Sequence, residues 1–108
     1  MSTKAASHLA ALQADLSAFR DYLAAERGMA KNTVLAYQAD LVKYRDWSAG
    51  GGLANYLAPS VRELTNYLGY LKEDGLAPPS VARNLIATKM FYRFLQLEER
   101  VQHAEPRA

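Results

Sequence analysis

The chain has no cysteine, and its two histidines, His8 and His103, lie at opposite ends of the sequence. The lack of cysteine excludes disulfide bonds and thiolate metal sites, and it is compatible with a reducing cytosol. The two histidines are too far apart to have the spacing of a ligand pair. We therefore expect no bound metal and no cofactor.

Long apolar runs are lacking as well. No stretch approaches the roughly 20 apolar residues that a membrane span needs, and the first twelve residues continue into a helical pattern instead of a signal peptide. Half of the 108 residues are hydrophobic and 22% are charged, which is typical of one soluble globular domain. We expect a cytoplasmic protein with no membrane partner.

Four segments have apolar residues at helical spacing, and none alternates as a strand does. The expected helices cover about residues 7–27, 30–47, 59–74 and 78–97, so the fold class is all-α. Their inward stripes are Leu9, Leu12, Leu16, Phe19 and Leu23; Val34, Tyr37, Leu41, Tyr44 and Trp47; Val61, Leu64, Leu68 and Leu71; Val81, Leu85, Tyr92 and Leu95.

The connections between these segments carry helix stop and start signals. Gly28 and Gly75 suit helix ends, residues 50–52 are three glycines in a flexible connection, and Ser60 with Glu63 has the spacing of a capping box. Residues 26–34 resemble residues 73–81 position by position. This similarity predicts two helical hairpins packed into one unit, although any two helix–glycine–helix corners look somewhat alike.

Charge is distributed unevenly along the chain. The net charge of +2 is too small to indicate a nucleic-acid partner, but residues 76–97 contain no acid. On a helical wheel one face of this segment carries Arg83, Ile86, Lys89, Met90 and Arg93. Such a face suits a helix in a DNA groove, with the small and polar residues Ser80, Asn84 and Ala87 approaching closely. A solvated face without acids would look the same.

The start of the second helix offers a further set of polar side chains. Lys31, Asn32 and Gln38 are expected on its exposed side, where amides read adenine or bind phosphate, and Thr33 could donate to phosphate. Ordinary capping chemistry accounts for Asn32 and Thr33 equally well. Tyr37, with Tyr44 and Trp47, is expected in the core.

Two stretches together carry a family resemblance. Residues 19–41, FRDYLAAERGMAKNTVLAYQADL, resemble the Xer-type tyrosine recombinases of the phage integrase family, whose recurring theme is F-x-x-Y-L-x-x-E-R-G-x-S-x-x-T-x-x-x-Y-x-x-D-L. Residues 75–95, GLAPPSVARNLIATKMFYRFL, are similar to the theme G-x-S-x-x-S-I-x-R-x-L-S-A-L-R-x-F-Y-R-F-L of the same family. The resemblance covers about residues 10–100.

The resemblance implies a SAM-like core-binding domain, an orthogonal bundle of four to five helices. Residues 1–108 would form this single domain, with 1–6 and 101–108 flexible and the catalytic domain absent from the chain. The second and fourth helices would face the major groove of double-stranded DNA. The first helix would contact neighbouring recombinase protomers, and the isolated domain would be a monomer. By position, the implied DNA contacts are Asn32, Thr33, Tyr37, Ser80, Arg83, Ala87 and Lys89.

Combined with the charge pattern, the expected DNA-binding residues are Lys31, Asn32, Thr33, Tyr37, Gln38, Ser80, Arg83, Asn84, Ala87, Lys89 and Arg93. No catalytic residue is expected, because the nucleophilic tyrosine and its helpers belong to the family's carboxy-terminal domain. His103 and Arg107 are one residue too far apart for the family's H-x-x-R motif. The chain is thus expected to bind DNA without cutting it.

The chain departs from the family pattern at three positions. Ala30 and Ala77 stand where a serine cap is usual, a loss that typically costs about 1 kcal/mol. Ile86 stands where serine is common, on the expected DNA side. It could pack against a thymine methyl group, or the DNA readout could differ here.

Three other functions compete with DNA binding by a recombinase domain. A helical protein–protein module is the main one, because fold does not fix function. A small enzyme lacks support from any nucleophile–base pair or phosphate-binding loop. A repressor would be expected to have a compact helix-turn-helix with a short recognition helix.

Overall fold

The computed structural model describes residues 3–98, which form four α-helices and one short π-helical segment. The helices are α1 (Thr3–Ala25), α2 (Lys31–Trp47), α3 (Val61–Glu73) and α4 (Pro78–Leu97), and the π-helical segment η1 (Ser48–Gly52) follows α2 directly. No strand occurs within residues 3–98, which confirms the all-α prediction. Residues 3–6 belong to α1, and the expected flexible tail at 101–108 lies outside the described residues.

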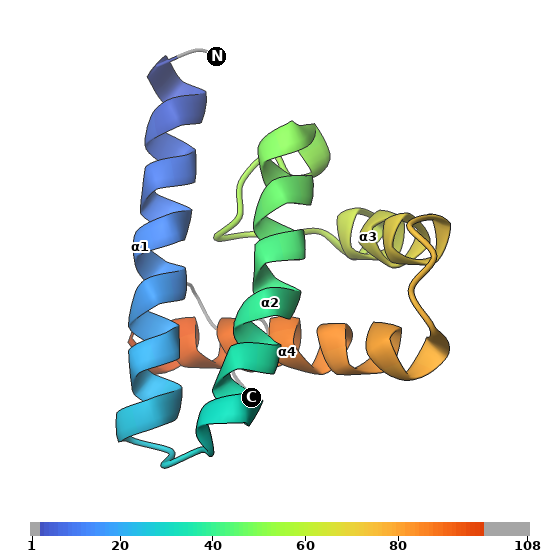
Figure 1. The fold of residues 1–108 in the computed structure, drawn as a ribbon. Coiled ribbons are helices and arrows are strands. Elements are labelled where there is room, and N and C mark those ends of the chain that lie inside the picture. The colour runs from blue at the N-terminus through green and yellow to red at the C-terminus, as the bar shows by residue number, and fades with distance from the viewer. Residues whose placement is uncertain (1–2, 99–108) are drawn as a thin grey trace, which may run out of the picture.

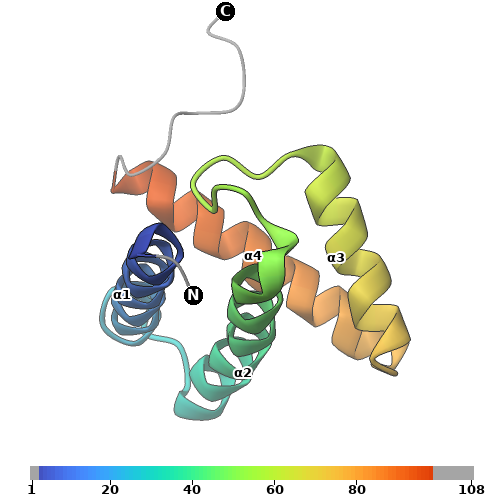
Figure 2. The same cartoon turned by 90° about the horizontal axis from the view of Figure 1, so that it is seen from above.

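The helices form two hairpins that cross one another. α1 and α2 run antiparallel side by side, and α4 lies across both of them (Figure 1). Seen from above, α3 packs on the opposite side of α2 from α1, next to the first half of α4 (Figure 2). The first turns of α2 extend past α4 before the two helices cross (Figure 1).

Both hairpin corners are built alike, as the internal similarity predicts. Gly28 and Gly75 have positive φ angles of 61° and 84°, which glycine adopts without steric cost. At the first corner the Met29 amide donates to the Leu23 carbonyl at 3.0 Å, and at the second the Leu76 amide donates to the last turn of α3. Met29 and Leu76 both pack against the core.

The core joins all four helices, and two of its predicted members are wrong. Val61 is 82% exposed and Leu85 also lies at the surface, whereas Tyr67, Phe91 and Phe94 are buried. The inward face of α4 is therefore rotated from the predicted stripe. Of the predicted inward residues of the first two helices, Leu9 is half-buried, and the others are buried or pack against the core.

The three glycines after α2 are part of a defined turn. Gly51 has a φ of 100° within η1, and Gly52 lies directly against the indole ring of Trp47. A Cβ atom at position 52 would overlap that ring, whereas one at position 50 would meet nothing within 4 Å. Trp47 in turn packs on Tyr67, with ring centroids 4.9 Å apart. The glycine here provides space for a close contact.

The predicted capping box at the start of α3 is present. The Glu63 amide donates to Ser60 Oγ at 3.0 Å, and the Ser60 amide donates to Glu63 Oε1 at 2.9 Å. The Ala54 amide donates to the second carboxylate oxygen at 2.9 Å. Hydrogen bonds from the Ser60 and Ala54 backbone lower the pKa of Glu63. This carboxylate fixes the connection between η1 and α3.

Candidate nucleic-acid interface

α4 presents an exposed face that carries cations and no acid. Ile86, Lys89 and Arg93 are all exposed, and Pro78–Leu97 contains neither aspartate nor glutamate. The three follow one another at spacings of three and four residues, so they share one side of the helix. The cations and Ile86 of the predicted face are thus solvent-accessible, whereas Met90 packs partly against the core. Contact of this face with DNA stays a prediction.

Two of the expected contact residues on α4 are fully buried. Ala87 belongs to the hydrophobic core, and Asn84 has no exposed surface. The Tyr67 hydroxyl donates to Asn84 Oδ1 at 2.6 Å, and Asn84 Nδ2 donates to the Asp40 carbonyl at 3.1 Å. A buried amide needs such partners because water cannot reach it. The expectation that Asn84 and Ala87 face DNA is therefore wrong, and Asn84 instead links α2, α3 and α4.

Arg83 is engaged by a buried carboxylate that sequence reasoning missed. Its Nε donates to Asp40 Oδ2 at 2.7 Å and its Nη2 donates to Oδ1 at 2.9 Å, a bidentate pair. The Asp40 side chain is 4% exposed and that of Arg83 is 47% exposed. Hydrogen bonding to this carboxylate raises the pKa of Arg83. The guanidinium is thus held against α2 while about half of the side chain stays in solvent.

The position of Asp40 in the sequence indicates that its side chain is buried. It lies three residues after Tyr37 and four before Tyr44, so it falls on the inward face of α2. An acid on such a face requires a partner, because a buried charge without one is costly. The spacing could have predicted a buried acid at this position, but not that Arg83 of a distant helix is its partner.

The start of α2 exposes the expected polar residues. Lys31, Asn32 and Thr33 are exposed, while Tyr37 is half-buried and packs against the core. Tyr37 lies one turn before Asp40, which accepts from the Arg83 guanidinium. The structure therefore brings the first turns of α2 and the Arg83 side of α4 toward one another.

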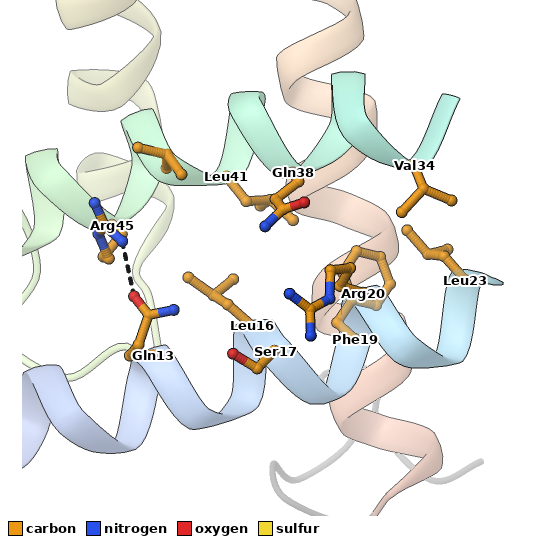
Figure 3. A pocket seen from close by; sticks show the side chains of 11 residues that line it. Gln13, Leu16, Ser17, Phe19, Arg20, Leu23, Val34, Gln38, Leu41 and Arg45 are labelled. Carbon is orange, nitrogen blue, oxygen red and sulfur yellow. Dashed lines mark hydrogen bonds between the residues drawn. The ribbon is translucent and has the colours of Figure 1, made fainter. Parts of the chain in front are cut away.

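Gln38 lies apart from these residues. It lines a small pocket of about 70 Å³ between α1 and α2. In Figure 3 its side chain points toward α1, near Leu16 and Arg20, and Arg45 at the far end donates to Gln13 at 2.8 Å. The pocket does not include any residue of α4. Gln38 is exposed as predicted, but it is not grouped with the α4 cations.

α2 and α4 both begin without a side-chain cap, as predicted from Ala30 and Ala77. The first turns of α2 and α4 differ in how many backbone amides are free to donate to a capping side chain. Pro78 and Pro79 have no amide hydrogen, and the Ser80 amide already donates to the Ala77 carbonyl at 2.9 Å. Ser80 is half-buried. A cap at position 77 therefore has little to satisfy, whereas α2 begins with three ordinary amides.

This difference predicts unequal effects of two identical substitutions. Ala30→Ser should raise the free energy of unfolding by about 1 kcal/mol, because its hydroxyl can accept from an amide of the first turn of α2. Ala77→Ser should change it by less than about 0.3 kcal/mol for lack of a free donor. Thermal unfolding would show about 5 °C of stabilisation for the first variant only. Equal shifts in both variants would contradict this assignment of donors.

The hydroxyls of the core tyrosines are hydrogen-bonded. The hydroxyls of Tyr44 and Tyr92 are 2.7 Å apart, and the Tyr92 hydroxyl also lies 2.6 Å from the Tyr56 carbonyl oxygen. Burial raises the pKa of Tyr44 to about 12 and raises the pKa values of Tyr67 and Tyr92 as well. These three hydroxyls stay protonated at neutral pH, which suits structural hydrogen bonds and opposes nucleophilic attack.

The described part of the chain contains no cluster of three or more histidine or acidic side chains that could hold a metal ion. Among the same residues, no helix combines the length and apolarity that crossing a membrane requires. The chain therefore belongs to the class of small all-α domains built from two helical hairpins. One face of α4, the helix that crosses α1 and α2, is basic and contains no acid.

Family comparison makes the assignment specific. Residues 16–99 match the family described as phage integrase, N-terminal SAM-like domain, and the chain belongs to this family. The match includes α2, α3, α4 and the last ten residues of α1. The resemblance in the two corner motifs is thereby confirmed.

Curated relatives are Xer recombinases. The chain is 34% identical to tyrosine recombinase XerC of Pseudomonas aeruginosa over 92 residues, which is 85% of this chain and 30% of that protein. It is 39% identical to tyrosine recombinase XerD of Rhizobium meliloti over 77% of this chain and 26% of that protein. The chain thus spans between a quarter and a third of the length of these relatives. Comparison with solved structures gives no significant match.

Proposed function

We propose that this chain is the DNA-binding amino-terminal domain of a site-specific tyrosine recombinase. In this proposal α2 and α4 grip the major groove of the recombination site, and a separate carboxy-terminal domain performs cleavage and joining. The chain itself binds double-stranded DNA without cutting it. In the assembled enzyme it also contacts neighbouring protomers.

The exposed, acid-free face of α4 is the observation that carries the proposal. α4 contains no acid, so no side chain of this helix neutralises Lys89 or Arg93. DNA phosphates supply the missing negative charge, and releasing their counterions favours binding. Family membership supports the same surface, since the curated relatives are named as recombinases, proteins that act on DNA.

The proposed contacts fall into two groups. On α4 they are Arg83, Lys89 and Arg93, with Ser80 near the helix start. On α2 they are Lys31, Asn32, Thr33 and Tyr37, which lie on the turns that extend past α4. Asn84 and Ala87 are excluded because they are buried. Gln38 faces the α1–α2 pocket and is left out of the proposed interface.

Salt dependence provides the first test. Lys89→Ala should weaken binding to a 30-base-pair duplex about eightfold at about 0.1 M salt and lower the slope of log K against log salt by about 0.9, as loss of one phosphate contact requires. Fluorescence anisotropy over a salt series would measure both quantities. Arg62→Ala removes one exposed charge from α3 and serves as the control, with a slope close to that of the wild-type chain.

Equal slopes for the wild-type chain and Lys89→Ala would remove this part of α4 from the interface. A protein–protein module is then the second candidate function. Its support is the apolar surface on the other side of α2, where Leu35 and Val42 are exposed beside the α1–α2 pocket.

A further inference from the structure

Ile86 is an apolar side chain in the middle of a cationic surface. It is 51% exposed, although it lies on a helix whose opposite side supplies much of the core. Arg83 precedes it by three residues and Lys89 follows it by three, so each lies about one turn away on the same side. An isoleucine here contributes little to the fold, since half of its surface stays in water.

The residues around Ile86 limit the kinds of binding partner that could cover its side chain. A binding partner must carry negative charge for Lys89 and for the exposed part of Arg83, whose Nε and Nη2 are held by Asp40. It must also offer one apolar group at the centre. The major groove of DNA has both properties, because phosphates line its edges and thymine displays a C5-methyl group on its floor. That methyl is the only apolar substituent that the four bases present in the groove.

We propose that Ile86 is a specificity-determining residue that packs against the C5-methyl group of a thymine when α4 lies in the major groove. This inference rests on the proposed function, since it requires α4 to enter the groove. Arg83 and Lys89 hold the helix through phosphates on either side, which carry no sequence information. Ile86 adds a preference for thymine at one base step through burial of apolar surface.

Replacement of thymine by deoxyuridine tests the contact, because it removes the methyl group and keeps every hydrogen-bonding group. The probe is a 30-base-pair duplex whose central steps alternate adenine and thymine between G·C ends, so every register offers a methyl. The wild-type chain should bind it about fourfold more tightly than the same duplex with deoxyuridine, the effect of burying about one methyl-sized group. Ile86→Ser should bind both duplexes equally.

Leu35→Ser is the matched control. Leu35 is also 51% exposed but lies on α2, on the side that faces away from α4. This variant loses a similar apolar area and should keep the fourfold preference for thymine. Thermal unfolding of both variants establishes that neither change disturbs the fold.

Two results would overturn the inference and leave the proposed function intact: equal wild-type affinity for both duplexes, or a thymine preference that persists in Ile86→Ser. A third result would overturn the proposed function as well as the inference. If the wild-type chain binds neither duplex even at about 0.01 M salt, where phosphate contacts are strongest, the proposed function fails and the inference fails with it.

Discussion

Replacing Arg83 with methionine should lower the free energy of unfolding by about 2 kcal/mol, because it leaves the buried Asp40 carboxylate without its cation. Removing one partner of a fully buried ion pair costs about 3–5 kcal/mol. The smaller figure applies here because about half of the Arg83 side chain is in solvent and water screens the pair. Urea denaturation followed by circular dichroism would measure the loss.

A double variant, Asp40→Leu with Arg83→Met, is the control for this interpretation. Well-packed apolar replacements of buried ion pairs are often neutral, so the double variant should regain most of the stability. It also keeps the net charge of the wild-type chain, since one charge of each sign is lost. A loss of DNA binding in the stable double variant would therefore report on the absence of the Arg83 guanidinium itself, since neither the fold nor the net charge has changed. If Arg83→Met alone is as stable as the wild type, Asp40 does not depend on this pair.

Gly52→Ala should destabilise the domain by about 2 kcal/mol, because its methyl group would overlap the Trp47 ring. The ring has little room to move, since it also packs on Tyr67. Gly50→Ala is the matched control two residues earlier. Its methyl meets nothing within 4 Å, and this change should alter stability by less than about 0.5 kcal/mol.

Thermal unfolding of the two glycine variants distinguishes a packing effect at Gly52 from an effect of chain flexibility on stability. If flexibility of the glycine run were what matters, both variants would change stability alike, since each reduces the freedom of the unfolded chain by a similar amount. A difference of about 10 °C between them would follow from the contact alone. Equal melting temperatures would contradict the close approach of Gly52 to Trp47.

Helix ends were predictable because their signals are local. α4 has the bounds expected from its two prolines and its periodicity, and Gly28 and Gly75 end their hairpin arms as expected. The Ser60–Glu63 capping box needed only residues within one turn. None of these features depends on which helix packs against which.

The inward face of α4 was not predictable in the same way. An apolar stripe through Leu85 places Asn84 outside, because an isolated amide looks like a surface residue. In the structure Asn84 is buried by Tyr67 from α3 and the Asp40 carbonyl from α2. Those partners are 17 and 44 residues away in sequence, and no periodicity reports on them.

The residues of the candidate interface also divide into those that local sequence predicts and those that depend on how the helices pack. Lys89 and Arg93 were correctly placed on an exposed face because a helical wheel suffices for them. The engagement of Arg83 by Asp40, 43 residues apart, was missed because it needs the crossing of α2 and α4. The DNA contacts themselves stay predictions for all of these residues.

The crossing of α2 and α4 has a mechanical consequence. Asp40 accepts from Arg83 through its carboxylate and from Asn84 through its main chain, so one residue anchors two successive positions of the other helix. Rotation of α4 about its own axis would break both contacts together. We therefore expect the two helices to rotate together, so that a torque applied to either one reaches the other.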